Sequence, residues 1–134
     1  MTPAQLIEDW ECEIAKVKSD PILGTKPVHS RRLLMEGMII ELLNRECPFD
    51  VAVRIIRRCR ALGYAHMTHR LTCEGWFIRT LRENGHESRA RALRTRVTKL
   101  FERYCKEAGA TSAYRKQMLG WLNLPPRPLN PLTQ

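Results

Sequence analysis

The sequence lacks any apolar run long enough to cross a membrane and any recognisable leader. No stretch approaches the roughly 20 consecutive apolar residues that a spanning helix needs. Residues 1–5 contain neither the basic nor the apolar region of a secretory signal. The five cysteines are odd in number and widely separated, unlike the paired frameworks of small secreted domains. We therefore expect a cytoplasmic protein with reduced thiols and no membrane contact.

Motifs that carry catalysis are also missing. The seven glycines are isolated, so no glycine-rich phosphate loop is present, and no serine stands in a nucleophile-elbow pattern. Glu36 and Glu41 are five residues apart and do not share a helical face. Cys47 precedes Pro48, which removes a helix N–H donor that could activate the thiol. These absences predict a protein that is not an enzyme and needs no cofactor.

No segment alternates apolar and polar residues as a strand would, and no internal repeat is present. The chain has 134 residues, of which 43% are hydrophobic, and this is enough to bury a core of its own. We predict an all-α fold, a compact single-domain bundle of five or six helices over residues 1–124. Four prolines within residues 125–134 predict an extended, proline-rich C-terminal tail.

Six helices are predicted from apolar spacing and from residues that begin or end helices. Thr2 and Gln5 can form a capping box at the start of the first helix. Gly63 and Gly109 suit the C-terminal ends of the third and fifth helices. The second helix is apolar on nearly all sides, which predicts that it is the buried centre of the bundle. The expected ranges are about 3–19, 30–45, 50–62, from 68–72 to 84, 88–109 and 111–122.

Two further expectations concern the core. The fifth helix has an apolar stripe at 4-3-4 spacing, formed by Leu93, Val97, Leu100 and Tyr104 and widened by Phe101, and we expect these residues to be buried. Most aromatic side chains fall on apolar stripes and are expected to pack in the core. Trp76 and Tyr114 are the exceptions, because each stands beside basic residues and could stack on an unpaired base.

Acidic residues are scarce where basic residues are most frequent. Residues 1–48 carry six basic and eight acidic side chains, a net charge of −2, whereas residues 49–134 carry seventeen and six, a net charge of +11. Between positions 54 and 103 every basic residue except Lys99 is an arginine, and no acid occurs from Arg89 to Lys99. A solvated charged face normally mixes both signs. The imbalance therefore indicates a polyanionic or acidic partner.

Arginine offers a planar fork of donors that suits phosphate groups, so we expect a surface that binds nucleic acid. The third and fourth helices, joined at Gly63, resemble a helix-turn-helix in outline, which favours duplex DNA over RNA, as does the scarcity of exposed aromatics. The candidate groove contacts on the fourth helix are Arg70, Arg79 and Arg82. The candidate phosphate contacts are Arg54, Arg57, Arg58, Arg89, Arg91, Arg94, Arg96 and Lys99.

Two other kinds of partner fit the same charge pattern. The arginine-rich face of a protein-interaction module or inhibitor would dock an acidic or nucleic-acid-binding surface of a larger protein. In a homo-oligomer, the acidic first helix would meet the basic face of a neighbouring copy.

A zinc site is a separate hypothesis. Its candidate ligands are Cys59, His66, His69 and Cys73, of which the last two are four residues apart on one helical face. The spacing C-x6-H-x2-H-x3-C is not a common zinc pattern and contains no C-x2-C pair. The alternative, which we favour, is that both cysteines are small core residues and that the site holds no metal.

Overall fold

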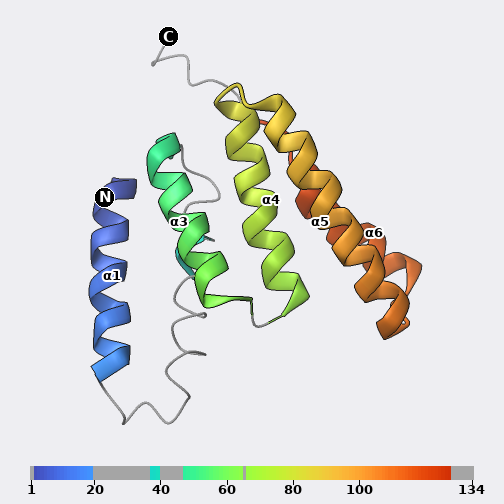
Figure 1. The fold of residues 1–134 in the computed structure, drawn as a ribbon, viewed down its shortest axis with the longest axis horizontal. Coiled ribbons are helices and arrows are strands. Elements are labelled where there is room, and N and C mark those ends of the chain that lie inside the picture. The colour runs from blue at the N-terminus through green and yellow to red at the C-terminus, as the bar shows by residue number, and fades with distance from the viewer. Residues whose placement is uncertain (1, 20–36, 40–46, 65, 128–134) are drawn as a thin grey trace.

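A computed structural model of the chain describes residues 2–19, 37–39, 47–64 and 66–127. Within these ranges every regular element is helical and none is a strand, which confirms the predicted all-α fold (Figure 1). The predicted second helix, apart from residues 37–39, and the last seven residues of the tail lie outside the described residues. The helices are α1 (Pro3–Ser19), α3 (Phe49–Leu62), α4 (Met67–Glu83), α5 (Glu87–Ala108), α6 (Ser112–Leu119) and the 3-10 helix η2 (Gly120–Asn123).

Local sequence signals set several helix ends. In the capping box of α1, the Thr2 backbone N–H donates to Gln5 Oε1 over 2.8 Å and the Gln5 N–H donates to Thr2 Oγ1 over 3.2 Å, as predicted. At the start of α6, Thr111 Oγ1 accepts a hydrogen bond from the Tyr114 N–H. Gly109 ends α5 in the left-handed conformation, with φ of +65°.

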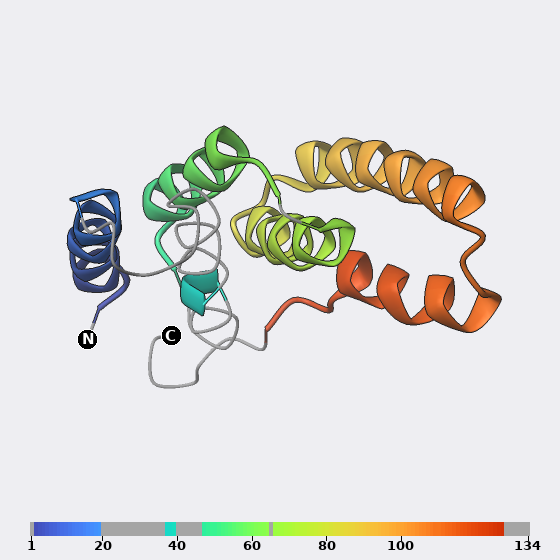
Figure 2. The same cartoon turned by 90° about the horizontal axis from the view of Figure 1, so that it is seen from below.

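The helices lie side by side in the order α1, α3, α4, α5, and α6 lies behind α5 (Figure 1). Figure 2 shows that α4 has α3 on one side and the α5–α6 pair on the other. In the same view α4 is set back from α3 and α5, so these two helices flank it on one side of the molecule. In this arrangement α4 lies behind and between α3 and α5, the two helices that carry most of the arginines.

The most enclosed of the described helices is α4. All eleven residues from Leu71 to Leu81 are buried, and Trp76 is fully inaccessible. At Gly75 the helix is crossed by η2 so closely that a Cβ atom would lie 2.1 Å from the Trp121 carbonyl oxygen. Only glycine permits this approach, and it lets Leu122 fill the core at 1% exposure.

The predicted central position of the second helix can be checked only at residues 37–39. There Met38 and Ile39 are buried, at 3% and 0% exposure, so this segment does contribute to the core. The remainder of that helix lies outside the described residues. Among the described helices the central position belongs to α4.

The stripe predicted on α5 is partly wrong. Leu93, Val97 and Phe101 are buried, as predicted, but Leu100 and Tyr104 are each 39% exposed. The buried residues follow steps of three and then four: Ala90, Leu93, Val97, Phe101 and Cys105. A four-residue step advances about 40° beyond a full turn, so the buried line winds around α5 from α4 toward α6. Phe101 meets Tyr114 of α6 there, with ring centroids 6.1 Å apart.

A buried carboxylate ties the end of α3 to α4. Glu74 is 5% exposed and accepts two hydrogen bonds from Arg60, from Nε over 2.9 Å and from a terminal nitrogen over 2.7 Å. The Tyr64 hydroxyl donates a third hydrogen bond to Glu74 over 3.0 Å. Because Glu74 stabilises the cation, the pKa of Arg60 is raised. The result is an arginine whose position is fixed by the fold.

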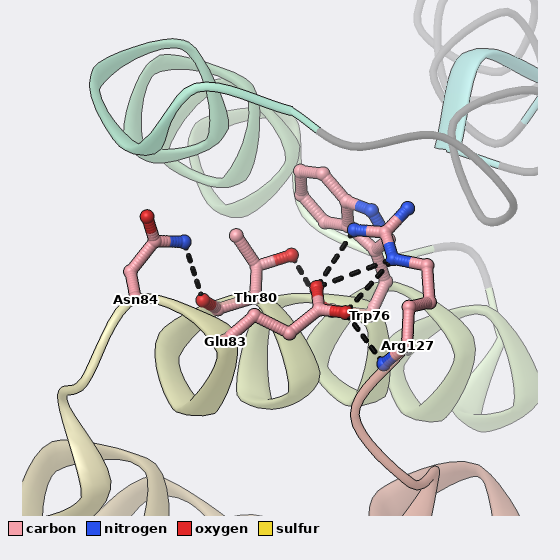
Figure 3. A network of polar contacts seen from close by, with 5 residues as sticks. All are labelled: Trp76, Thr80, Glu83, Asn84 and Arg127. Carbon is pink, nitrogen blue, oxygen red and sulfur yellow. Dashed lines mark hydrogen bonds and ion pairs between the residues drawn. The ribbon is translucent and has the colours of Figure 1, made fainter. Parts of the chain in front are cut away.

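The described start of the proline-rich tail is attached to α4 (Figure 3). Glu83 accepts hydrogen bonds from the Arg127 guanidinium and from the Arg127 backbone N–H, each at 2.7 Å. Both side chains are about one-sixth exposed, at 15% and 16%. In the same stretch of α4, the Thr80 hydroxyl donates a hydrogen bond to the Trp76 carbonyl, and the Asn84 side-chain amide donates one to the Thr80 carbonyl. Arg127 is therefore anchored to α4.

Candidate polyanion-binding surface

The predicted helix-turn-helix is wrong, because its second helix is α4. A recognition helix must expose one face to the major groove, whereas α4 is enclosed over residues 71–81. Arg79 is 8% exposed, and burial lowers its pKa. Arg82 is held by Glu87 at 3.4 Å and by the Leu124 carbonyl at 3.5 Å. Arg70 is half-buried, with its guanidinium carbon 5.4 Å from the centre of the Tyr64 ring. These three arginines are not arranged to reach into a groove.

The zinc hypothesis also lacks support in the structure. Cys59 and Cys73 are core residues, each 2% exposed. His66 and His69 meet edge to face, with ring centroids 5.0 Å apart. Within the described ranges, no group of three or more His, Cys, Asp or Glu side chains could hold a metal ion.

The two aromatic side chains singled out for base stacking have other surroundings. Trp76 is fully buried in α4, so the prediction that it could stack on a base is wrong. Tyr114 is half-buried against Phe101, and its hydroxyl lies 3.4 Å from Thr68 Oγ1. The exposed aromatic of this region is Tyr104, which the sequence pattern had assigned to the core.

Burial also accounts for the cysteines. Desolvation raises the pKa of Cys47 to about 11 and raises that of Cys105, so both remain neutral thiols near pH 7. All five cysteines are free, and only Cys12 is exposed.

Two of the predicted phosphate contacts interact with other residues of the fold. Arg58 forms an ion pair with Glu11 of α1 at 2.8 Å, although both partners remain partly exposed. Arg94 lies 3.5 Å from Asn123 Oδ1 of η2. Exposed pairs of this kind stabilise a protein by about 1 kcal/mol or less. Arg58 and Arg94 therefore remain accessible to solvent, but their guanidinium groups interact with neighbouring helices.

The remaining predicted contacts are exposed cations of α3 and α5. Among the described residues, none of these side chains has an acidic partner. The guanidinium carbon of Arg89 lies over the Phe49 ring, 5.7 Å from the ring centre. On α5, Arg89 and Arg96 are seven residues apart and fall within about 20° of each other around the helix. They lie on the α3 side, whereas Arg91 is about 140° from Arg96. The exposed cations are Arg54, Arg57, Arg89, Arg91, Arg96 and Lys99.

We define the arginine surface as Arg57, Arg89, Arg96 and Lys99, which belong to the two helices that flank α4. Arg54 is excluded because it lies toward Arg58 and α1, about 60° around α3 from Arg57. The surface continues into a pocket of about 160 Å³ where α3, α4 and α5 meet. Its cationic lining is Arg60, Arg89 and Arg96, and its apolar lining is Phe77, Leu81, Ala92 and Leu93.

Arg60 is the member of this pocket that the sequence analysis did not select. It stands three residues after Arg57, and this helical spacing could have indicated that Arg60 belongs to the same basic surface. Its fixed position depends on Glu74, fourteen residues further along the chain, and no local pattern reveals that pairing.

A second, larger pocket of about 600 Å³ lies at the far end of α5. It contains both signs of charge, because Glu102 forms an ion pair with Arg115 there. Its other lining residues are Arg103, Cys105, Lys106 and Ala110.

In comparisons with known proteins, no family model, no curated protein and no solved structure matches the chain. Among the described residues, no helix has both the length and the apolar character that crossing a membrane requires.

Proposed function

We propose that this protein binds nucleic acid through phosphate contacts made by the arginine surface. The observation that carries the proposal is a set of exposed cations on the two helices that flank α4, without acidic partners among the described residues. Four like charges on the two helices that flank α4 repel one another, and a polyanion relieves that repulsion. Phosphate is the anion that guanidinium groups bind with two parallel hydrogen bonds.

The same observations favour contacts to the backbone over contacts to base edges. Among the described helices, α4 is enclosed over residues 71–81, so it cannot present the base-reading face of a helix-turn-helix. Phosphate contacts fix position and contribute affinity but carry no sequence information. The earlier preference for duplex DNA rested mainly on the helix-turn-helix, so duplex DNA, single-stranded DNA and RNA are compared directly in the test.

The test is a salt titration of binding, because each phosphate contact releases counterions. For about four contacts, the slope of log K against log salt is near −4 for duplex DNA and near −3 for a single strand. Replacing both Arg57 and Arg96 with alanine should flatten this slope by roughly two and weaken all sequences alike.

The matched control replaces Arg91 and Lys116, which removes the same charge from exposed positions outside the arginine surface. Its slope should stay close to that of the parent protein. Equal slopes for the two double variants would show that net charge, not this surface, determines binding. Absence of binding to all three nucleic acids at 50 mM salt would refute the proposal.

A second candidate function is docking to an acidic protein, and one specific observation favours it. Leu100 and Tyr104 are the exposed large hydrophobic side chains of the described residues, and both lie on α5 within about 80° of Arg96. Apolar groups beside arginine are typical of protein interfaces. This candidate predicts that Leu100→Ser weakens partner binding, whereas nucleic-acid binding by phosphate contacts should be unaffected.

A further inference from the structure

We infer that the pocket between α3, α4 and α5 binds a terminal phosphate monoester of a nucleic acid, so that the protein recognises strand ends. This inference rests on the proposed function, because the pocket opens within the same arginine surface. Its cations are Arg60, Arg89 and Arg96, contributed by the two flanking helices, and its other lining residues are apolar. The rest of the surface would hold the adjoining backbone.

The charge of the pocket matches a terminal phosphate better than an internal one. Three guanidinium groups line it, and Glu74 behind Arg60 neutralises one of them, which leaves two positive charges. A phosphate monoester carries a charge of about −1.5 to −2 at pH 7. An internal phosphodiester carries one negative charge and has fewer terminal oxygens to accept hydrogen bonds.

One of the three arginines is held in place by hydrogen bonds before any ligand arrives, and a second lies over an aromatic ring. Glu74 accepts two hydrogen bonds from Arg60, whose guanidinium carbon lies 5.7 Å from the centre of the Phe77 ring. Arg89 lies over the Phe49 ring at the same distance. Fixed donors lose little entropy when an anion binds. Arg96 is exposed and without an acidic partner among the described residues, so it is free to close over the ligand.

The size and the apolar lining of the pocket fit a single phosphate group. A volume of about 160 Å³ corresponds to roughly five water molecules at liquid density. That space admits a phosphate group and its ester oxygen. Phe77, Leu81 and Leu93 are each at most 6% exposed, and this apolar lining strengthens the attraction between guanidinium and phosphate.

The experiment compares oligonucleotides that differ only in a terminal phosphate. Fluorescence anisotropy is measured with a 12-nucleotide strand bearing 5′-phosphate, 3′-phosphate or hydroxyl at both ends, each as a single strand and as a duplex. A terminal phosphate at one or both kinds of end should strengthen binding about tenfold, the effect of one added hydrogen bond between charged groups. Arg96→Ala should reduce this ratio to near one, and Arg96→Lys should restore part of it, because lysine keeps the charge but not the fork.

Arg91→Ala is the matched control, since Arg91 is exposed on the same helix but about 140° from Arg96. It should leave the phosphate ratio unchanged. Equal binding of phosphorylated and unphosphorylated strands overturns the inference while leaving the proposed function intact. A phosphate preference that persists in Arg96→Ala, or a phosphoserine peptide that competes as well as the strand, also overturns it. Failure of every strand to bind refutes the proposed function itself.

Discussion

Replacing Gly75 with alanine should destabilise the protein, although alanine is the better helix former. A Cβ atom at this position would lie 2.1 Å from the Trp121 carbonyl oxygen and 2.8 Å from the carbonyl carbon. Both atoms belong to the backbone, so no change of rotamer relieves the overlap. The 3-10 helix η2 must move away from α4, and this movement loosens the packing of Leu122, which is 1% exposed.

The two opposing effects have different magnitudes. Glycine to alanine in a helix interior gains about 0.5–1 kcal/mol of stability. Overpacking of a tight core costs about 1–3 kcal/mol, and partial exposure of a buried leucine adds up to about 2 kcal/mol. The expected net loss in the free energy of unfolding is about 1–3 kcal/mol.

Gly120→Ala is the control at the other side of the same contact. Gly120 is helical, with φ of −56° and ψ of −33°, and an added Cβ there meets no atom within 4 Å. This variant should gain about 0.4–1 kcal/mol, because alanine restricts the unfolded chain. Urea unfolding followed by tryptophan fluorescence and circular dichroism measures both changes, provided that the slopes m agree. A midpoint for Gly75→Ala at or above that of the parent protein would refute the close approach of η2 to α4.

Three further predictions concern the ion pair of the tail, the cysteines and the buried carboxylate. Arg127 holds the pKa of Glu83 below its usual range, so this ion pair stabilises the folded state above about pH 4.5, and the stabilisation is lost as the pH falls through the lowered pKa. In urea unfolding, the free energy of unfolding of Glu83→Gln should therefore depend less on acid pH than that of the parent protein. An unchanged pH profile would contradict the pairing. A chelator should not shift the melting temperature, because Cys59 and Cys73 are core residues, whereas a fall of several degrees would restore the zinc hypothesis. Glu74→Leu leaves Arg60, whose side chain is 42% exposed, without its carboxylate and the Tyr64 hydroxyl without its acceptor, and should lower the free energy of unfolding by about 1–2 kcal/mol; calorimetry measures this loss, and an unchanged free energy of unfolding would refute it.

Local sequence patterns were enough to predict most of the helices but not the burial or the partners of individual arginines. The capping box at Thr2 and the glycine at position 109 lie next to the helix ends that they determine, so a short window contains the signal. The ion pairs involve partners far apart in the chain: Glu74 is 14 residues from Arg60, and Glu83 is 44 residues from Arg127. Neither pairing follows from spacing.

The candidate site shows the same division. The sequence predicted a basic surface on the third and fifth helices, because charge and helical spacing are local properties. It misjudged α4, since the residues that cover this helix come from α3, α5 and η2 rather than from its own neighbours. Arg79 is the clearest case: its residue type indicated a surface position, and tertiary packing buried it.

The enclosure of α4 also determines the order in which parts of the protein open. Its amide protons can exchange with solvent only when the helices on both of its sides have separated, which approaches complete unfolding. The outer helix α1 meets the described bundle through Leu6, Ile7 and Trp10 along one edge, and it can detach without exposing α4. Of the helices that the structure describes, hydrogen exchange should therefore be slowest in α4 and fastest in α1. Because Glu11 of α1 partly neutralises Arg58, each such detachment would transiently add one unpaired cation to the outside of α3.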